Sequence, residues 1–334
     1  MSTMPERELR DSYGRVIGDL RISITDRCNF RCTYCIPVEN VDWKPRSEIL
    51  TYEELIRLTR IFARFGVRKL RVTGGEPLLR PQATSLIRRL SKIEGVEDLS
   101  LTTNGKLLPA FAPELRSAGV RRINISLDSL RHDRFFAMTR RNALREVLEG
   151  IQAASDAGFA PIKINAVVIR GVNDDEIESF ATFSRETGHT VRFIEFMPLD
   201  SGHLWSIDQV VSGREILERL KGAFPLIRLP QRSDSETAVR WGFEDSPGEI
   251  GIIAPVTAPF CGNCNRIRLT ADGMLRTCLF SLVEHDVKTP LRRGASDEEM
   301  MERIGAMVLT KEPGHRINRE DFVQPERTMS CIGG

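Results

Sequence analysis

Six strand-like stretches alternate with helix-like stretches between residues 20 and 196, and this alternation restricts the fold more than any other feature. Strands are predicted at 20–25, 67–73, 97–102, 121–127, 162–169 and 191–196. Alternating strands and helices favour a parallel sheet. Because the crossovers in such a sheet are right-handed, six successive units would curl it toward a barrel.

The predicted barrel is incomplete. A full eight-unit barrel typically needs ~250 residues, whereas the alternation ends after Met197. We therefore predict an α/β fold built on an incomplete (β/α)6 TIM-like barrel, with a doubly wound open sheet as the alternative. In both folds a site is expected at the C-terminal ends of the strands.

Local signals predict where several helices begin and end. Thr51 and Glu54 form a capping box before the first apolar helical stripe, and Gly66 follows that stripe. Pro81 is expected at the first position of the next helix. A further helix, beginning near Leu144, is expected to end at Gly158.

The sequence changes character after about residue 225. Short strand-like pieces, a hairpin turn at 271–273 and a helical run at 296–308 replace the regular alternation. Pro230 and the polar run that follows it are typical of a linker. We predict two domains: a partial barrel over 1–230, and a C-terminal α+β extension over 231–334.

Composition narrows the class of protein. The chain has 334 residues, of which 41% are hydrophobic, and its net charge is +2. These values exclude a wholly disordered chain, and they give no basic field for nucleic acid. No apolar run approaches the roughly 18 residues of a membrane helix, and the first ten residues do not look like a targeting segment. We expect a cytoplasmic protein with no membrane contact, whose cysteines are ligands or free thiols.

Three cysteines, Cys28, Cys32 and Cys35, follow the first predicted strand with Cys-x3-Cys-x2-Cys spacing. A [4Fe–4S] cluster usually takes four cysteines, so three leave one iron open to a small molecule. Buried structural thiols are a weaker reading, because polar residues flank the triplet. A zinc site would need a fourth ligand.

A second triplet, Cys261, Cys264 and Cys278, has Cys-x2-Cys-x13-Cys spacing across the predicted hairpin. Zinc with His285 as fourth ligand and a second iron–sulfur cluster are both open on this segment alone. Arg266 and Arg268 alternate on the strand after Cys264, so their side chains share one face. Two guanidiniums beside a metal site suit a phosphate or a base edge, although arginines also line solvated strands.

Taken together, the motifs resemble one family of radical S-adenosylmethionine (SAM) enzymes, the GTP 3′,8-cyclases of molybdenum cofactor biosynthesis. The resemblance runs from about Arg21 to the C-terminus. It rests on both cysteine triplets and on the segments Thr73-Gly74-Gly75-Glu76-Pro77, Thr102-Thr103-Asn104-Gly105, Asn124-Ile125-Ser126-Leu127-Asp128-Ser129, Phe193-Ile194-Glu195-Phe196-Met197-Pro198 and Gly333-Gly334.

The resemblance implies two [4Fe–4S] clusters, a first on Cys28, Cys32 and Cys35 that binds SAM, and a second on the other triplet that binds the guanine of GTP. It implies SAM contacts from Tyr34, Gly75, Ser126 and Met197. It implies GTP contacts from Arg21, Arg71, Thr102, Lys163, Arg266, Ile267 (backbone at most) and Arg268, with Lys69 and Arg192 as secondary phosphate partners. It also implies that the tail, Gly333 and Gly334, enters the active site; Cys331 is expected to be a free thiol.

The implied reaction is a lyase-type cyclisation. A 5′-deoxyadenosyl radical removes the ribose 3′ hydrogen of GTP, and the resulting carbon attacks guanine C8. The implied partners are an electron donor such as a reductase or flavodoxin, cyclic pyranopterin monophosphate synthase as acceptor of the product, and a second copy in a homodimer. Peptide-modifying radical SAM maturases and a zinc-binding interaction module are the rival readings.

Overall fold

The computed structural model describes residues 7–36, 41 and 43–333. Its twelve strands form one mixed sheet with the order β12-β11-β10-β1-β2-β3-β4-β5-β6-β9-β8-β7. The strands are β1 (Asp19–Ser23), β2 (Lys69–Thr73), β3 (Asp98–Thr103), β4 (Arg122–Ser126), β5 (Lys163–Val168), β6 (Thr190–Glu195), β7 (Leu226–Arg228), β8 (Val239–Phe243), β9 (Glu249–Ile253), β10 (Arg266–Leu269), β11 (Met274–Arg276) and β12 (His285–Asp286).

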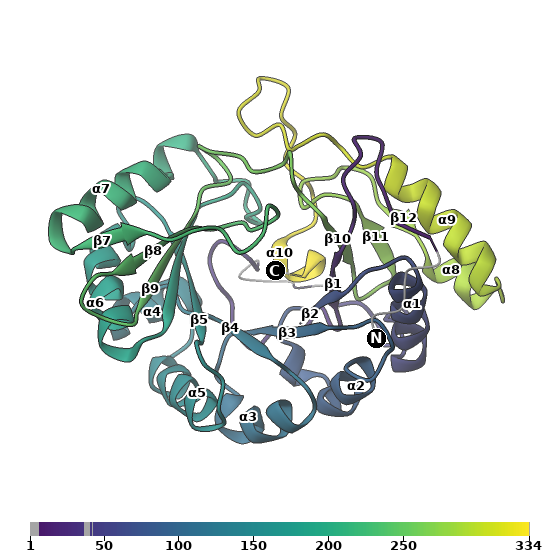
Figure 1. Cartoon of the computed structure of the whole chain (residues 1–334), viewed down its shortest axis with the longest axis horizontal. Coiled ribbons are helices and arrows are strands. Elements are labelled where there is room, and N and C mark those ends of the chain that lie inside the picture. Colours follow the sequence, from purple (N-terminus) through teal and green to yellow (C-terminus); the bar gives the residue numbers. More distant parts are fainter. Residues whose placement is uncertain (1–6, 37–40, 42, 334) are drawn as a thin grey trace.

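The helices cover the convex side of the curved sheet, except for the C-terminal α10, which lies inside the curve (Figure 1). They are α1 (Tyr52–Arg64), α2 (Ala83–Leu90), α3 (Leu108–Ser117), α4 (His132–Thr139), α5 (Leu144–Asp156), α6 (Ile177–Thr187), α7 (Gly213–Ala223), α8 (Lys288–Arg292), α9 (Asp297–Leu309) and the C-terminal α10 (Met329–Ile332), with short 3-10 turns at Pro77–Leu79, Asp174–Glu176 and Ile207–Gln209.

The six predicted βα strands form the centre of the sheet. Strands β1 to β6 are parallel neighbours in chain order, which confirms the α/β prediction and argues against a doubly wound sheet, whose strand order reverses. The C-terminal strands join the same sheet, because β10 pairs in parallel with β1, and β9 with β6. The division near residue 230 stays a prediction.

The predicted start of α1 and the predicted ends of α1 and α5 are confirmed, since Gly66 also takes a positive φ after α1, whereas the predicted start of α2 is wrong. Thr51 and Glu54 form the capping box of α1, and Gly158 takes a positive φ directly after α5. Pro81 does not begin α2. That helix begins at Ala83, after Gln82 has taken a left-handed conformation as N-cap, because the chain first has to leave the Pro77–Leu79 turn.

One hydrophobic core lies between the helices and the sheet. It contains apolar strand positions such as Leu20 and Ile22 and the apolar stripe of α1, including Leu58 and Phe62, all fully buried. Because side chains alternate along a strand, Arg21 points to the opposite, inner face of the sheet. Among the described residues, no helix is long and apolar enough to cross a membrane.

Candidate active site

Three adjoining cavities line the inner face of the sheet. The first-triplet cavity, of about 180 Å3, contains Cys28, Cys32 and Cys35. The second-triplet cavity, of about 200 Å3, contains the other three predicted ligands. Thr102 and Met197 line both cavities, so they stand at a common wall. A third, basic cavity of about 300 Å3 shares four arginines with the second: Arg21, Arg71, Arg192 and Arg266.

All four residues predicted to contact SAM line the first-triplet cavity: Tyr34, Gly75, Ser126 and Met197. They come from the cysteine loop and from the ends of β2, β4 and β6. The Tyr34 hydroxyl donates to Asp128 Oδ2 at 2.5 Å, and the other Asp128 oxygen accepts from Val167 N at 2.9 Å. Asp128, which the sequence did not single out, therefore fixes the Tyr34 ring at the cavity wall.

The Gly-Gly-Glu-Pro loop supports the cysteine loop. Gly75 N donates to Thr25 O, and Glu76 N to Arg27 O, both at 2.8 Å. A Cβ added at Gly75 would lie 2.4 Å from Arg27 O, and one added at Gly74 would lie 2.6 Å from Thr25 O. The two glycines are therefore required because the backbone of their loop lies directly against the backbone of residues 25–27. This contact holds the first triplet near the C-terminal end of β2.

Glu76 is a second residue whose role only the structure reveals. Its carboxylate is fully buried and accepts from Thr103 Oγ1 at 2.9 Å, Asn104 N at 2.8 Å and Leu78 N at 3.0 Å. Burial raises its pKa to about 7 despite these bonds. Glu76 thus joins the two motifs that follow β2 and β3. Both motifs are visible in the sequence, but this contact between them is not.

Cys264 differs from the other cysteines of the two triplets whose pKa is shifted, because burial raises the pKa of Cys278 as it does in the first triplet. Burial raises the pKa of Cys28 to about 11 and that of Cys35 to about 12. Burial also raises the pKa of Cys264, but the positive charges of Arg266 and Lys311 outweigh it and leave that pKa below its ordinary value. Because metal ligands bind as thiolates, loading the first triplet would release protons at neutral pH.

Three of the predicted GTP residues form a row across adjacent strands. Arg21 on β1 is in register with Arg268 on β10 and with Arg71 on β2. The Nε atoms of Arg21 and Arg71 are buried and have no hydrogen-bond partner among the described residues, and the same holds for Thr102 Oγ1. Burial, followed by the charges of Arg71 and Arg268, lowers the pKa of Arg21 well below its ordinary value.

Buried hydrogen-bond donors without partners, gathered at one place, are typical of a site that binds an anion. Arg21 and Arg71 are half-buried and form no ion pair within 4.0 Å among the described residues. Asp19 acts on both of them, but the nearby arginines outnumber it, so a ligand with negative charge would be stabilised there. The row therefore fits a phosphate or another anionic group. Arg266, beside the row, donates to Ser235 O at 2.9 Å and lies over the Phe260 ring.

Lys163 and Lys69 line the basic cavity, with Arg192 between it and the second-triplet cavity. Burial, and then the charge of Arg192, lowers the pKa of Lys163 to about 7. Arg192 is held by Asn165 Oδ1 at 2.8 Å and by Asn124 Oδ1 at 2.7 Å. Ile267 points into the hydrophobic core, so only its backbone is available to a ligand, as the sequence analysis expected.

The C-terminal tail enters the inner face of the sheet, where α10 lies near the centre of the molecule (Figure 1). Met329 lines both triplet cavities and Ser330 lines the first. Arg268 donates to Gly333 O. Gly333 has φ +86°, and a Cβ there would lie 2.9 Å from Thr73 Cγ2. Gly334 lies outside the described residues.

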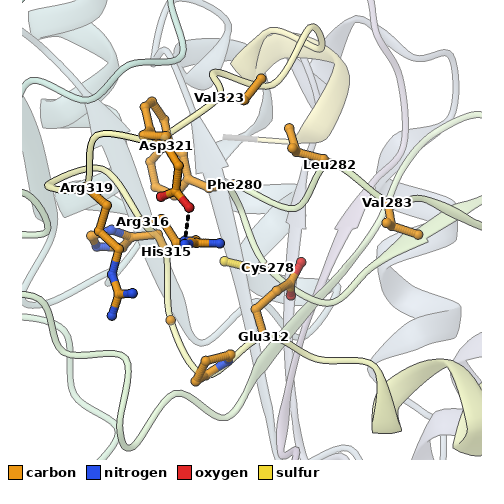
Figure 2. Close-up of a pocket in the computed structure, with 13 residues that line it drawn as sticks. Cys278, Phe280, Leu282, Val283, Glu312, His315, Arg316, Arg319, Asp321 and Val323 are labelled. Carbon is orange, nitrogen blue, oxygen red and sulfur yellow. Dashed lines mark hydrogen bonds and ion pairs between the residues drawn. The ribbon is translucent and has the colours of Figure 1, made fainter.

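An outer pocket of about 730 Å3 lies on the other side of the second triplet. Figure 2 shows the Cys278 sulfur with the Glu312 side chain on one side and the Arg316–Asp321 ion pair on the other. Cys278 also lines the second-triplet cavity. This cysteine therefore stands between the interior site and the outer pocket.

The structure does not draw either cysteine triplet together around a single metal ion. Within the part of the chain that the structure describes, no three His, Cys, Asp or Glu side chains are placed to hold one metal ion. His285, the proposed fourth zinc ligand, contacts Thr310 Oγ1 at 3.0 Å. All seven cysteines are free thiols, and Cys331 is among them.

Comparison with known proteins matches the chain to two family models, which meet between residues 184 and 189. Residues 22–184 match the family described as Radical SAM superfamily, and 189–317 match Molybdenum Cofactor Synthesis C. A protein named GTP 3′,8-cyclase from Rhodopirellula baltica is 47% identical over 98% of this chain and 92% of its own length. A protein of the same name from Thermodesulfovibrio yellowstonii is 45% identical over 98% of this chain and all of its own length.

A solved structure adds evidence about the fold. Streptococcus suis SuiB, bound to its precursor peptide SuiA, matches 96% of this chain and 77% of its own with a TM-score of 0.58. The two sequences are 14% identical, so this likeness concerns the fold alone.

Proposed function

The chain belongs to the GTP 3′,8-cyclase family of radical SAM enzymes, and from this membership we propose how its three cavities divide the reaction. The function is conversion of GTP to (8S)-3′,8-cyclo-7,8-dihydroguanosine 5′-triphosphate in molybdenum cofactor biosynthesis. The cofactors are two [4Fe–4S] clusters and SAM. The assignment of each to particular residues is our proposal.

We assign the first cluster to Cys28, Cys32 and Cys35, and SAM to the rest of that cavity. The four predicted SAM contacts come together there from separate parts of the chain. The close approach of the glycine loop fixes the cysteine loop, and the Tyr34–Asp128 bond fixes the ring beside it.

We assign the second cluster to Cys261, Cys264 and Cys278, with guanine at its open iron and the triphosphate in the basic cavity. Arg21, Arg71 and Arg266 line both cavities, so one nucleotide can extend from the second triplet into the cations beyond it. Lys163, Lys69 and Arg192 lie at the phosphate end. The observation that carries the assignment is the row of arginines on adjacent strands, in which the Nε atoms of Arg21 and Arg71 are buried without a hydrogen-bond partner among the described residues.

When bound, the first cluster and SAM would supply a 5′-deoxyadenosyl radical that removes the 3′ hydrogen of the ribose. The ribose C3′ can then attack guanine C8. The residues of the chain hold the two substrates against each other. Thr102 and Met197 stand where the two cavities meet, which supports a position of the ribose next to the SAM end of the site. Positioning of this kind and the exclusion of water protect a reactive carbon from side reactions.

We propose that the curved sheet is an incomplete (β/α)6 barrel. Its six consecutive parallel strands support that description. We also propose a functional division near residue 230: the SAM site belongs to 1–230, and the second cluster belongs to 231–334. The GTP site draws on both, because Arg21 and Arg268 are in register on neighbouring strands.

The proposed partners follow from the chemistry. Cyclisation leaves a base radical that needs one electron and one proton, so an electron donor of the reductase or flavodoxin type is required. The reactive product suits direct transfer to cyclic pyranopterin monophosphate synthase. A homodimer is proposed from the family resemblance alone.

Anaerobic incubation of the reconstituted protein with dithionite, SAM and GTP tests the function, with small molecules followed by mass analysis. We expect 5′-deoxyadenosine together with an isomer of GTP. Deoxyadenosine that forms whether or not GTP is present, with no GTP isomer, would keep the radical SAM half of the proposal and refute GTP as substrate.

A further inference from the structure

The segment after α9, Lys311–His315, lies against the second triplet although no sequence motif drew attention to it. Lys311 is 3% exposed. Its ammonium donates to Arg266 O at 2.9 Å and also to Thr277 O. One carbonyl lies two residues after Cys264 and the other immediately before Cys278. Lys311 therefore ties together the two chain segments that carry these cysteines.

Other contacts of the segment reach the third cysteine. A Cβ added at Gly314 would lie 2.9 Å from Cys261 Cβ, so the segment packs directly on that side chain. Arg15, from the N-terminal part of the chain, donates to Cys261 O at 2.9 Å and to Glu312 O at 2.6 Å. The segment consequently contacts or supports all three positions of the triplet.

The charge of Lys311 is not balanced by a carboxylate. Among the described residues Lys311 forms no ion pair within 4.0 Å; the nearby Glu312 carboxylate instead accepts from Thr277 Oγ1 at 2.9 Å. A buried ammonium is unfavourable unless negative charge lies close to it. Three cysteine ligands bind metal as thiolates, and here they are the negative charges that the site would supply.

We propose that Lys311 is a positioning residue and the fixed counter-cation of the second cluster, raising its reduction potential. This inference rests on the assignment of a second cluster under the proposed function. Adding an electron makes a cluster more negative, so a fixed positive charge beside it favours the reduced state; charge and hydrogen bonding are among the factors that set such potentials. A lysine that only joined two backbone segments would leave the potential unchanged when replaced by a group that keeps the segments folded.

The test uses the full chain with Cys28, Cys32 and Cys35 replaced by alanine, so that iron and its signals report on the second triplet alone. Lys311→Met removes the charge at similar length, and Lys311→Arg retains it. Lys288→Met is the matched control, because Lys288 also donates to a backbone carbonyl, that of Glu48, at 3.0 Å. Iron per chain and an anaerobic redox titration followed by electron paramagnetic resonance are measured.

We expect Lys311→Met to lower the midpoint potential, cutting the reduced-to-oxidised ratio at fixed potential at least tenfold, which is 59 mV for a one-electron couple. Lys311→Arg should restore most of the shift, and Lys288→Met should match the parent. Iron lost in Lys311→Met but kept in Lys311→Arg supports the positioning role of Lys311, and only the shift in potential supports its role as counter-cation. An unchanged potential in Lys311→Met, or equal loss in both Lys311 variants, overturns it. A parent protein without iron overturns the second-cluster assignment itself.

Discussion

Arg71 shows how a single residue can serve a ligand at the expense of the free protein. Its Nε atom is buried without a partner among the described residues, and burial lowers its pKa. Replacing Arg71 with an apolar side chain of similar length avoids the cost of removing this guanidinium from water, which the attraction of Asp19 and Asp98 only partly offsets. The same change removes a cation from the proposed phosphate path.

Arg71→Met should therefore raise the free energy of unfolding of the protein without ligand by about 1 kcal/mol and weaken GTP binding by about tenfold or more. Arg60→Met, at an exposed position of α1, is the control and should change neither quantity. Denaturant unfolding and calorimetric titration provide the measurements. An Arg71→Met protein that is less stable and binds GTP normally would show that the arginine row is structural.

The lowered pKa of Lys163 leads us to predict that GTP affinity depends on pH. Burial and Arg192 lower its pKa to about 7 in the free protein, whereas a bound triphosphate would raise that pKa by favouring the ammonium form. Below pH 7 the lysine is already charged, so it adds no dependence. Above pH 7, binding takes up a proton, and the affinity should fall by up to about tenfold per pH unit until the pKa of the complex is reached.

Calorimetry in buffers of different ionisation enthalpy measures this proton uptake directly. Lys163→Arg should remove most of it, because a guanidinium stays protonated. Equal uptake at pH 8 by the original protein and by Lys163→Arg would exclude Lys163 as its source.

At the residue scale, the cysteine ligands were predictable from their spacing, and the SAM contacts from the family resemblance. Both cysteine triplets are regular enough in the sequence to indicate ligands, and the residues predicted for SAM do line one cavity. Asp128 and Lys311 were not predicted as site residues, because their roles depend on partners distant in the chain: Asp128 meets Tyr34, and Lys311 meets carbonyls beside the second triplet.

At the scale of elements, the loop after β2 is the support of the first triplet. Gly75→Ala would place a Cβ within 2.5 Å of backbone oxygens of Asp26 and Arg27. Overpacking of this kind costs about 1–3 kcal/mol, and the cysteine loop would have to move. We expect iron per chain to fall to about half, because the second triplet is untouched.

Gly262→Ala is the matched control for Gly75→Ala. It also lies in a cysteine loop, but nothing comes within 4 Å of its Cβ and its φ is not positive. Iron analysis and thermal unfolding should find it unchanged. Full iron and unchanged stability in Gly75→Ala would refute the supporting role of the glycine loop.

The central strands were predictable because apolar runs and helix caps are local signals. The six predicted strands match β1 to β6 within two residues at each end. The strands that flank these six were less predictable. Strand β9 pairs with β6 and β10 with β1, and such pairing depends on contacts between distant segments. The register that aligns Arg268, Arg21 and Arg71 arises in the same way.

At the scale of the whole molecule, segments far apart in the chain meet at the site. Arg15 supports Cys261, and the tail delivers the Gly333 carbonyl to Arg268. Deleting Gly333 and Gly334 should abolish cyclisation while leaving both clusters and reductive SAM cleavage intact. The cysteine ligands lie elsewhere in the chain, so iron content per chain is the internal control. Full cyclase activity in the truncated protein would refute the role of the tail.

The central claim is that the first-triplet cavity faces the ribose of GTP across the wall formed by Thr102 and Met197. The most direct measurement uses GTP carrying deuterium at the ribose 3′ position, incubated anaerobically with reconstituted protein, SAM and dithionite. Mass analysis of the 5′-deoxyadenosine then reports which hydrogen was removed. The account predicts one deuterium in the deoxyadenosine formed during turnover. Deoxyadenosine without deuterium, formed alongside the cyclised product, would contradict it.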